Sequence, residues 1–135
     1  MRETVVDYGR GVGGALLVGL QFVFTFEGWW AGFHMPAYKV LLLTGFNMGV
    51  LLILQYYSGI QPDRSAADRV REAVVAYGIG VFVAALALYG FNVLGPQSAL
   101  RTAVGSVAIA AIPLSIGASV AMHLFGDEEP AAEER

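Results

Sequence analysis

The chain contains no cysteine, and charged residues make up only 14% of it. Without cysteine it has no disulfide, no thiolate metal site and no cysteine nucleophile. Cysteine usage therefore does not indicate the redox state of its compartment. Hydrophobic residues make up 56% of the chain and its mean hydropathy is +0.61, which lies outside the usual range of soluble domains. The composition therefore predicts an all-α, polytopic membrane protein with no soluble or nucleic-acid-binding domain.

Apolar segments close to the ~20 residues of a membrane-spanning helix occur repeatedly along the chain. The four segments lie at about residues 12–33, 37–58, 73–94 and 102–125. Because the connections after the first and third segments are short, the helices are expected to pair as two tight antiparallel hairpins. We assign residues 1–126 to this transmembrane domain and residues 127–135, with five of the eleven acidic residues, to a disordered tail.

Lysine and arginine fall unevenly on the two sides of the predicted membrane domain. Six of the eight lie near the termini or in the middle loop, and only Lys39 and Arg101 lie on the other side. The positive-inside rule then places both termini and the middle loop in the cytoplasm of a multi-pass protein of the cell membrane. In the middle loop, Ser65 is a predicted helix N-cap, with acidic Asp68 in the first turn.

Glu27 is an acid inside the first apolar segment, just before Trp29 and Trp30. The two tryptophans are expected at the outer interface, where aromatic side chains gather, and Glu27 then lies roughly 9 Å below the outer end of its helix. An ionised side chain in hydrocarbon costs at least ~2.5 to 3.5 kcal/mol, so an intramembrane acid indicates a functional site. Two interpretations remain open: Glu27 binds an ion or a proton, or it is a structural ion-pair partner of Lys39 or Arg101.

Polar residues recur at helical spacing inside the apolar segments. They are Thr44, Asn47, Gln55 and Ser58 in the second segment, Gln21 and Thr25 in the first, and Asn92 in the third. Side chains three or four residues apart share one helix face, so the stripe of the second segment faces protein or water. One interpretation is interhelical hydrogen bonding, worth ~0.6 kcal/mol per contact. The other is a polar lining, in which Asn47 and Asn92 face the same outward-opening cavity as Glu27.

Small residues mark the faces on which the helices are expected to pack. Gly45 and Gly49 form one GxxxG pair, and Gly28 and Gly32 form another. Such faces let two helices approach closely. Pro113 is expected to kink the last segment, because proline cannot donate the helical hydrogen bond. Since a four-helix protomer is too small to enclose a wide aqueous path, we expect a homo-oligomer.

No arrangement of residues points to catalysis, a metal or a cofactor. His34 and His123 lie on opposite sides of the predicted bilayer, so they cannot form one metal site within a subunit. Ser119, His123 and Asp127 have the spacing of a hydrolytic set. However, Gly126 is expected to end the helix before Asp127, and nothing supplies an oxyanion hole. We therefore expect a non-enzymatic protein without a cofactor.

Several short motifs are spread over most of the chain. They are Arg10-Gly-Val-Gly-Gly-Ala-Leu-Leu17, Phe24-Thr-Phe-Glu-Gly-Trp-Trp30, Tyr56-Tyr-Ser-Gly59 and Ile112-Pro-Leu-Ser-Ile-Gly-Ala-Ser119. Together they resemble an uncharacterised family of bacterial and archaeal integral membrane proteins. The resemblance implies a helical membrane fold and no established activity, and it carries over Glu27, Trp29 and Trp30 as the signature residues.

These features favour a small homo-oligomeric channel or transporter for an inorganic cation or a proton in the lipid bilayer. Glu27 is the expected ion- or proton-binding group, because rings of carboxylates select cations. The neutral dipoles expected along the path are Asn47, Gln55, Asn92, Thr25 and Gln21. The alternative is a non-transporting membrane scaffold or accessory subunit, in which Glu27 pairs with Lys39 or Arg101.

Overall fold

The computed structural model describes residues 2–19, 21, 26–57 and 65–126, without the side chains of 26–28 and 124–126. Every regular element in this described part is a helix, which confirms the all-α class there. The elements are α1 (Arg2–Gly14), the wider π-helical turn η1 (Ala15–Gly19), α3 (Phe26–His34), α4 (Ala37–Tyr57), α5 (Ala66–Gly90) and α6 (Leu100–Gly126).

Three of the described helices are long and apolar enough to cross a membrane, namely α4, α5 and the Leu100–His123 part of α6. At a rise of 1.5 Å per residue, about 20 apolar residues cover the ~30 Å of a bilayer's hydrocarbon. The first predicted segment, 12–33, includes residues 20 and 22–25, which lie outside the described residues. A fourth crossing therefore stays a prediction.

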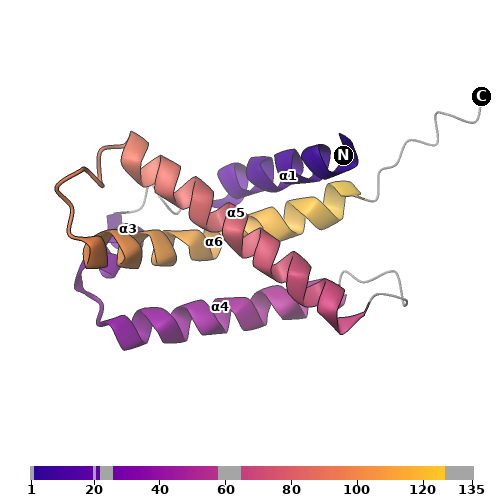
Figure 1. The fold of residues 1–135 in the computed structure, drawn as a ribbon, viewed down its shortest axis with the longest axis horizontal. Coiled ribbons are helices and arrows are strands. Elements are labelled where there is room, and N and C mark those ends of the chain that lie inside the picture. Colours follow the sequence, from indigo (N-terminus) through magenta and orange to yellow (C-terminus); the bar gives the residue numbers. More distant parts are fainter. Residues whose placement is uncertain (1, 20, 22–25, 58–64, 127–135) are drawn as a thin grey trace, which may run out of the picture.

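Helix α6 lies at the centre of the bundle, and each of the other described helices contacts it. In Figure 1, α4 runs beside α6, α1 and α3 lie toward its opposite ends, and α5 crosses it obliquely. Apart from Leu114, the fully buried side chains of α6 are small: Ser106, Ala111, Ser115, Ala118 and Ser119. Small side chains suit this central position, because helix association in lipid depends on close van der Waals packing.

Glycines lie where α3 and α5 cross close to the backbone of α6. A Cβ atom on Gly32 of α3 would lie 2.5 Å from the Cα of Ser106, and one on Gly80 of α5 would lie 2.7 Å from the N of Ser115. In both cases the neighbouring atom belongs to the backbone of α6. A larger residue at either glycine would therefore push two helices apart.

The other predicted glycine pair lies on an open face of α4. A Cβ atom added to Gly45 or Gly49 would meet no described atom within 4 Å. The expected close packing at this GxxxG pair is therefore absent between the described helices of one chain, whereas Gly32 packs as expected. For Gly28 only the backbone is described, so its packing stays a prediction.

The described parts of the first segment pack along α6. Gly14, at the end of α1, lies against Gly117 of α6, and Gly32 of α3 lies against Gly105. Between them, η1 buries Ala15 on the bundle side. The described parts of this segment thus run from the C-terminal half of α6 to its N-terminal half.

Ser65 caps α5, as the sequence predicts. Its Oγ accepts a hydrogen bond from the backbone N–H of Asp68 at 3.3 Å and donates one to Asp68 Oδ2 at 2.9 Å. The first bond satisfies one of the free N–H groups of the helix start, and the Asp68 carboxylate complements the positive end of the helix dipole.

Replacing the cap residue, Ser65→Ala, is expected to lower the free energy of unfolding by ~1 kcal/mol, because one helix N–H loses its acceptor. Circular dichroism during an SDS titration of the protein in detergent micelles measures the change. Ser65→Asp keeps an acceptor oxygen and should stay close to the wild type. An equal loss in both variants would contradict the capping role.

The end of α5 differs from the prediction. The third span was expected to reach residue 94 with Asn92 facing an ion path, but α5 ends at Gly90. Asn92 is exposed, with φ at 58° in the left-handed region, and the N–H groups of Val93 and Leu94 both bond to the carbonyl of Leu88. Asparagine tolerates this conformation better than most residues. Asn92 therefore shapes the turn that ends the helix.

Candidate functional site: a polar seam between two helices

Two residues of the predicted polar stripe, Asn47 and Gln55, face α6, whereas Ser58 lies outside the described residues. Asn47, Leu51 and Gln55 are the buried residues of α4, and their spacing of four residues puts them on one helix face. Opposite them lie Ser115 and Ser119 of α6, which are also buried. We call Asn47, Gln55, Ser115 and Ser119 the α4–α6 seam.

Two hydrogen bonds cross the seam. Asn47 Nδ2 donates to Ser115 Oγ at 2.9 Å, and Gln55 Nε2 donates to Ser119 Oγ at 3.2 Å. Ser115 Oγ donates its own proton to the carbonyl of Ile112 at 2.9 Å, so its oxygen is left to accept from Asn47. This arrangement fixes the orientation of the Asn47 amide. Interhelical hydrogen bonding, one of the two interpretations of the stripe, is therefore present.

Each amide of the seam also has an oxygen without a partner. Asn47 and Gln55 are only 1% and 3% exposed, and Asn47 Oδ1 and Gln55 Oε1 accept no hydrogen bond from any described residue. A buried polar atom without a partner costs ~1–3 kcal/mol. Such atoms are few in native interiors and often mark a place for water or an ion. The seam therefore has acceptor capacity that the described residues do not use.

A histidine and a glutamate continue the seam toward the C-terminal end of α6. His123 Nδ1 lies 2.7 Å from the carbonyl oxygen of Ser119, and His123 Nε2 lies 3.7 Å from Glu72 Oε2 of α5. Ser115, Ser119 and His123 follow one another at ~6 Å along α6, because each is one turn from the next. Polar groups thus extend from the middle of the bundle to this titratable pair.

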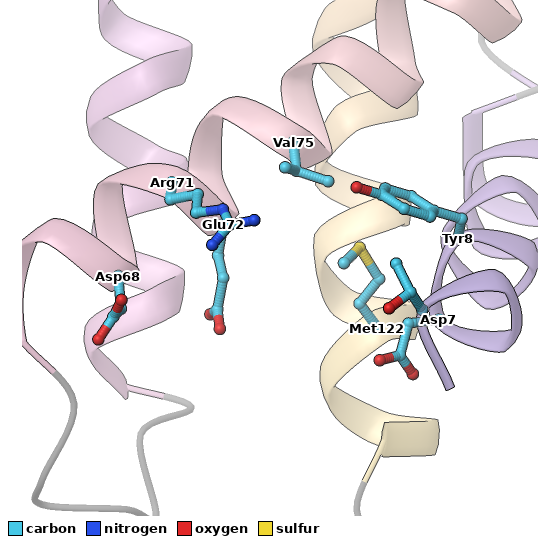
Figure 2. A pocket seen from close by; sticks show the side chains of 8 residues that line it. Asp7, Tyr8, Asp68, Arg71, Glu72, Val75 and Met122 are labelled. Atoms are coloured by element: carbon cyan, nitrogen blue, oxygen red, sulfur yellow. The ribbon is translucent and has the colours of Figure 1, made fainter. Parts of the chain in front are cut away.

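Glu72 also lines a cavity of about 370 Å³ between α1, α5 and α6. Figure 2 shows Glu72 and Asp68 on the α5 side of this space, with Asp7 and Tyr8 of α1 across from them. The cavity lies at the end of the bundle where α1 begins and α6 ends (Figure 1). The seam therefore approaches this cavity through Glu72.

A larger cavity, of about 730 Å³, lies at the opposite end between α3, α4 and α6. Val40 of α4 and Gly105 of α6 are among the residues that line it. Val40 precedes Asn47 by ~10 Å along α4. The seam is therefore flanked by a cavity toward each end of the bundle.

The predicted site residues of the first segment are only partly placed. Glu27 is the second residue of α3, but its side chain is not described. Thr25 lies outside the described residues, and Gly28 is described only by its backbone. Gln21 is exposed. The structure therefore does not bring Gln21 to the seam, and the position of the Glu27 carboxylate stays a prediction.

Aromatic and basic residues gather at the end of the bundle where α3 ends and α4 begins. Trp29 and Trp30 stand edge to face with ring centroids 6.5 Å apart, and the Trp30 and His34 rings are 4.5 Å apart. Lys39 of α4 and Arg101 of α6 are exposed at the same end. The side chain of Glu27 is not described, so the ion pairs of Lys39 and Arg101 with its carboxylate stay predictions.

The serine partners of the seam were not predicted from the sequence. Their signal in the sequence is the recurrence of Ser115, Ser119 and His123 at every fourth position, but the hydrolytic spacing considered above includes only Ser119 and His123 of these, together with Asp127. In a helix rich in glycine, alanine and serine, a buried serine has the same pattern as any small packing residue. Among the described residues, no three His, Cys, Asp or Glu side chains come close enough to hold a metal ion.

Comparison with known proteins matches the chain to a family of membrane proteins. The family model described as "Putative integral membrane protein (DUF2391)" matches residues 7–135, which include the seam and nearly all residues of both cavities. No curated protein and no solved structure matches the chain.

Proposed function

Because the chain belongs to this family of integral membrane proteins, we propose that it carries an inorganic cation or a proton across the membrane through the α4–α6 seam. The observation that supports this proposal is the pair of buried amide oxygens, Asn47 Oδ1 and Gln55 Oε1, that have no hydrogen-bond partner among the described residues. Neutral oxygen dipoles replace part of a cation's hydration shell, and they also accept hydrogen bonds from water that relays a proton.

The seam has several polar groups at successive levels of the bundle rather than a single binding site. From the middle of α6, Asn47 with Ser115 is followed one turn on by Ser119 with Gln55, and then by the His123–Glu72 pair. Steps of ~6 Å along α6 are short enough for one water molecule to bridge two groups. The cavity beside Glu72 supplies one mouth of this path.

Glu27 fits this path by its depth along α3. Glu27 lies five residues before Gly32. It is therefore ~8 Å deeper in the bundle than the contact between Gly32 and Gly105. That level is between the larger cavity and Ser115. We propose that the Glu27 carboxylate attracts the cation or binds the proton at this point.

The proposal includes four crossings, with residues 12–33 as the first. Gly14 lies against Gly117 and Gly32 lies against Gly105, so both described parts of that segment follow α6 in the opposite direction. The chain reverses between α3 and α4 and again between α5 and α6, which supports two antiparallel hairpins (Figure 1). The positive-inside rule then puts the start of α1 and the end of α6 in the cytoplasm of the cell membrane.

The proposed protein is a homo-oligomer that associates through α4. Of the three membrane-length helices described, α4 is the least buried within the chain. Its Gly45 and Gly49 meet no described atom on their open side. A second copy of α4 is the kind of partner that a GxxxG face accepts.

Flux measurements on the purified protein in liposomes test the proposal. With K⁺, Na⁺, Ca²⁺ and H⁺ gradients applied in parallel, the wild type is expected to dissipate at least one of them. Asn47→Leu and Gln55→Leu each replace one amide dipole by an apolar side chain, so flux should fall about tenfold for a barrier raised by ~1.4 kcal/mol. Glu27→Gln should reduce flux through the same gradient.

Gln21→Leu is the matched control, because it makes the same chemical change as Gln55→Leu at an exposed position. It should leave flux unchanged. Folded protein that dissipates none of the gradients would contradict the proposal. Wild-type flux in Asn47→Leu and Gln55→Leu would contradict the path through the seam.

A scaffold or accessory subunit is the second candidate function. The observation that favours it is that each seam amide already donates a hydrogen bond that ties α4 to α6. Under this alternative, Asn47→Leu lowers the free energy of unfolding by ~0.6 kcal/mol and at most about 1.7 kcal/mol, and no gradient is dissipated by any variant. Measuring stability and flux on the same preparations therefore separates the two functions.

A further inference from the structure

The larger cavity has a mostly apolar lining that contains Arg101, and the proposed cation path does not explain this lining. Apolar side chains from α3, α4 and α6 form most of its lining, including Phe33, Val40, Leu41 and Val104, and Arg101 stands among them. Its volume of about 730 Å³ is in the range of sites that hold an organic ligand, ~300–1,000 Å³. A bare cation needs neither this volume nor this apolar surface.

Positive charge at this cavity has no compensation among the described residues. Arg101 carries a permanent charge, and no described residue of the lining is acidic. Lys39 lies beside the cavity in the first turn of α4, two residues after the lining residue Ala37. An anion placed there would meet attraction from both basic side chains and no repulsion from the described lining.

Two helix N-termini add to this positive potential. α4 starts at Ala37 and α6 at Leu100, and both residues line the cavity. A helix N-terminus acts as roughly half a positive charge, which acidic residues in the first turn normally offset. Neither α4 nor α6 has one, whereas α1 has Glu3 and α5 has Asp68.

We infer that this cavity binds an anionic phospholipid, with its phosphate at Arg101 and the N-termini of α4 and α6, and an acyl chain along the apolar wall. The cavity lies near the ends of three helices that contact or enter the membrane, which is where lipid headgroups lie. Basic pockets between transmembrane helices bind anionic headgroups, and here Arg101 provides the charge while the apolar lining provides contact for an acyl chain. The inference depends on the membrane fold and not on transport through the seam.

The two tryptophans of the chain provide a built-in reporter of lipid in the cavity. The Trp29 ring lies 5.5 Å from that of Phe33, and the Trp30 ring lies 4.5 Å from that of His34. Both Phe33 and His34 line the cavity. A lipid whose acyl chain carries bromine will therefore quench tryptophan fluorescence when it occupies the site.

The experiment compares brominated phosphatidylglycerol with brominated phosphatidylcholine, each mixed at increasing mole fraction into vesicles of phosphatidylcholine that contain the full-length protein. The wild type should prefer the anionic lipid by at least about fivefold, the factor expected for one basic side chain at a membrane surface. Arg101→Gln should lower the ratio of the two apparent association constants about fivefold. Arg101→Lys keeps the charge and should retain a preference.

Arg2→Gln is the matched control, because it removes an exposed arginine at the other end of the bundle. It should leave the preference unchanged. A wild-type ratio of about one, or an unchanged preference in Arg101→Gln, would overturn the inference. If Glu27→Gln creates a preference that the wild type lacks, the Glu27 carboxylate neutralises the basic site instead, and the inference is also overturned.

Discussion

Gly32→Ala will destabilise the protein although alanine is the better helix former. The new Cβ atom would lie 2.5 Å from the Cα and 2.6 Å from the N of Ser106. These are backbone atoms, so the clash is relieved only when α3 moves away from α6, which also loosens the hydrogen bond from Ser106 Oγ to the carbonyl of Trp29. Overpacking of this kind costs ~1–3 kcal/mol, and contact with rigid backbone favours the upper part of that range.

Gly45→Ala makes the same chemical change on the open face of α4. Because no described atom lies within 4 Å of the new Cβ, only the gain in helix propensity remains, which is up to ~1 kcal/mol. The free energy of unfolding of monomeric protein in micelles should therefore fall for Gly32→Ala and stay level or rise for Gly45→Ala. Equal effects of the two variants would contradict the close crossing of α3 and α6.

Leu114→Ala will cause the largest loss of packing among single truncations in α6. Leu114 is fully buried, and it lies where Gly19 of η1 approaches α6. It belongs to the same cluster as Val83 and Leu88 of α5. Its truncation therefore opens a cavity shared by three elements.

The expected cost of Leu114→Ala is ~2 kcal/mol, at the low end of buried leucine truncations in proteins. The low end applies because the separated helices in lipid are surrounded by apolar chains, so the cost comes from lost packing and little from transfer to water. Leu42→Ala is the matched control, since Leu42 is 68% exposed. It should change the free energy of unfolding very little, and a loss equal to that of Leu114→Ala would place Leu42 in an interface.

Which residues face the protein interior could be predicted only where the pattern was periodic. Asn47, Leu51 and Gln55 recur every four residues, so their common face follows from helix geometry alone. Their partners did not follow, because Ser115 lies 68 residues away from Asn47 and has no local feature that sets it apart. The GxxxG pattern showed a similar limit, since Gly32 and Gly45 differ only in what the tertiary fold places next to them.

Element ends were predicted less well than element existence. Hydropathy carried the third span past Gly90, because Val93 and Leu94 are apolar although they belong to the turn. The wide turn η1 had no signal at all, since its five residues, Ala15–Gly19, have an ordinary apolar helical composition. Departures of this kind depend on the fit against α6, which a local window of sequence does not contain.

The central position of α6 also sets the order in which the bundle can assemble. α6 is the last described helix along the chain, and every other described helix packs on it. During synthesis the earlier helices therefore enter the bilayer before α6 exists. Asn47 and Gln55 are then in the membrane without Ser115 and Ser119, which accept their hydrogen bonds in the folded protein. Insertion and folding are consequently separate events for this chain, as in two-stage assembly of helical membrane proteins. Contacts such as that between α4 and α5 can form earlier, but the packing on α6 forms only when its small-residue surface reaches the membrane.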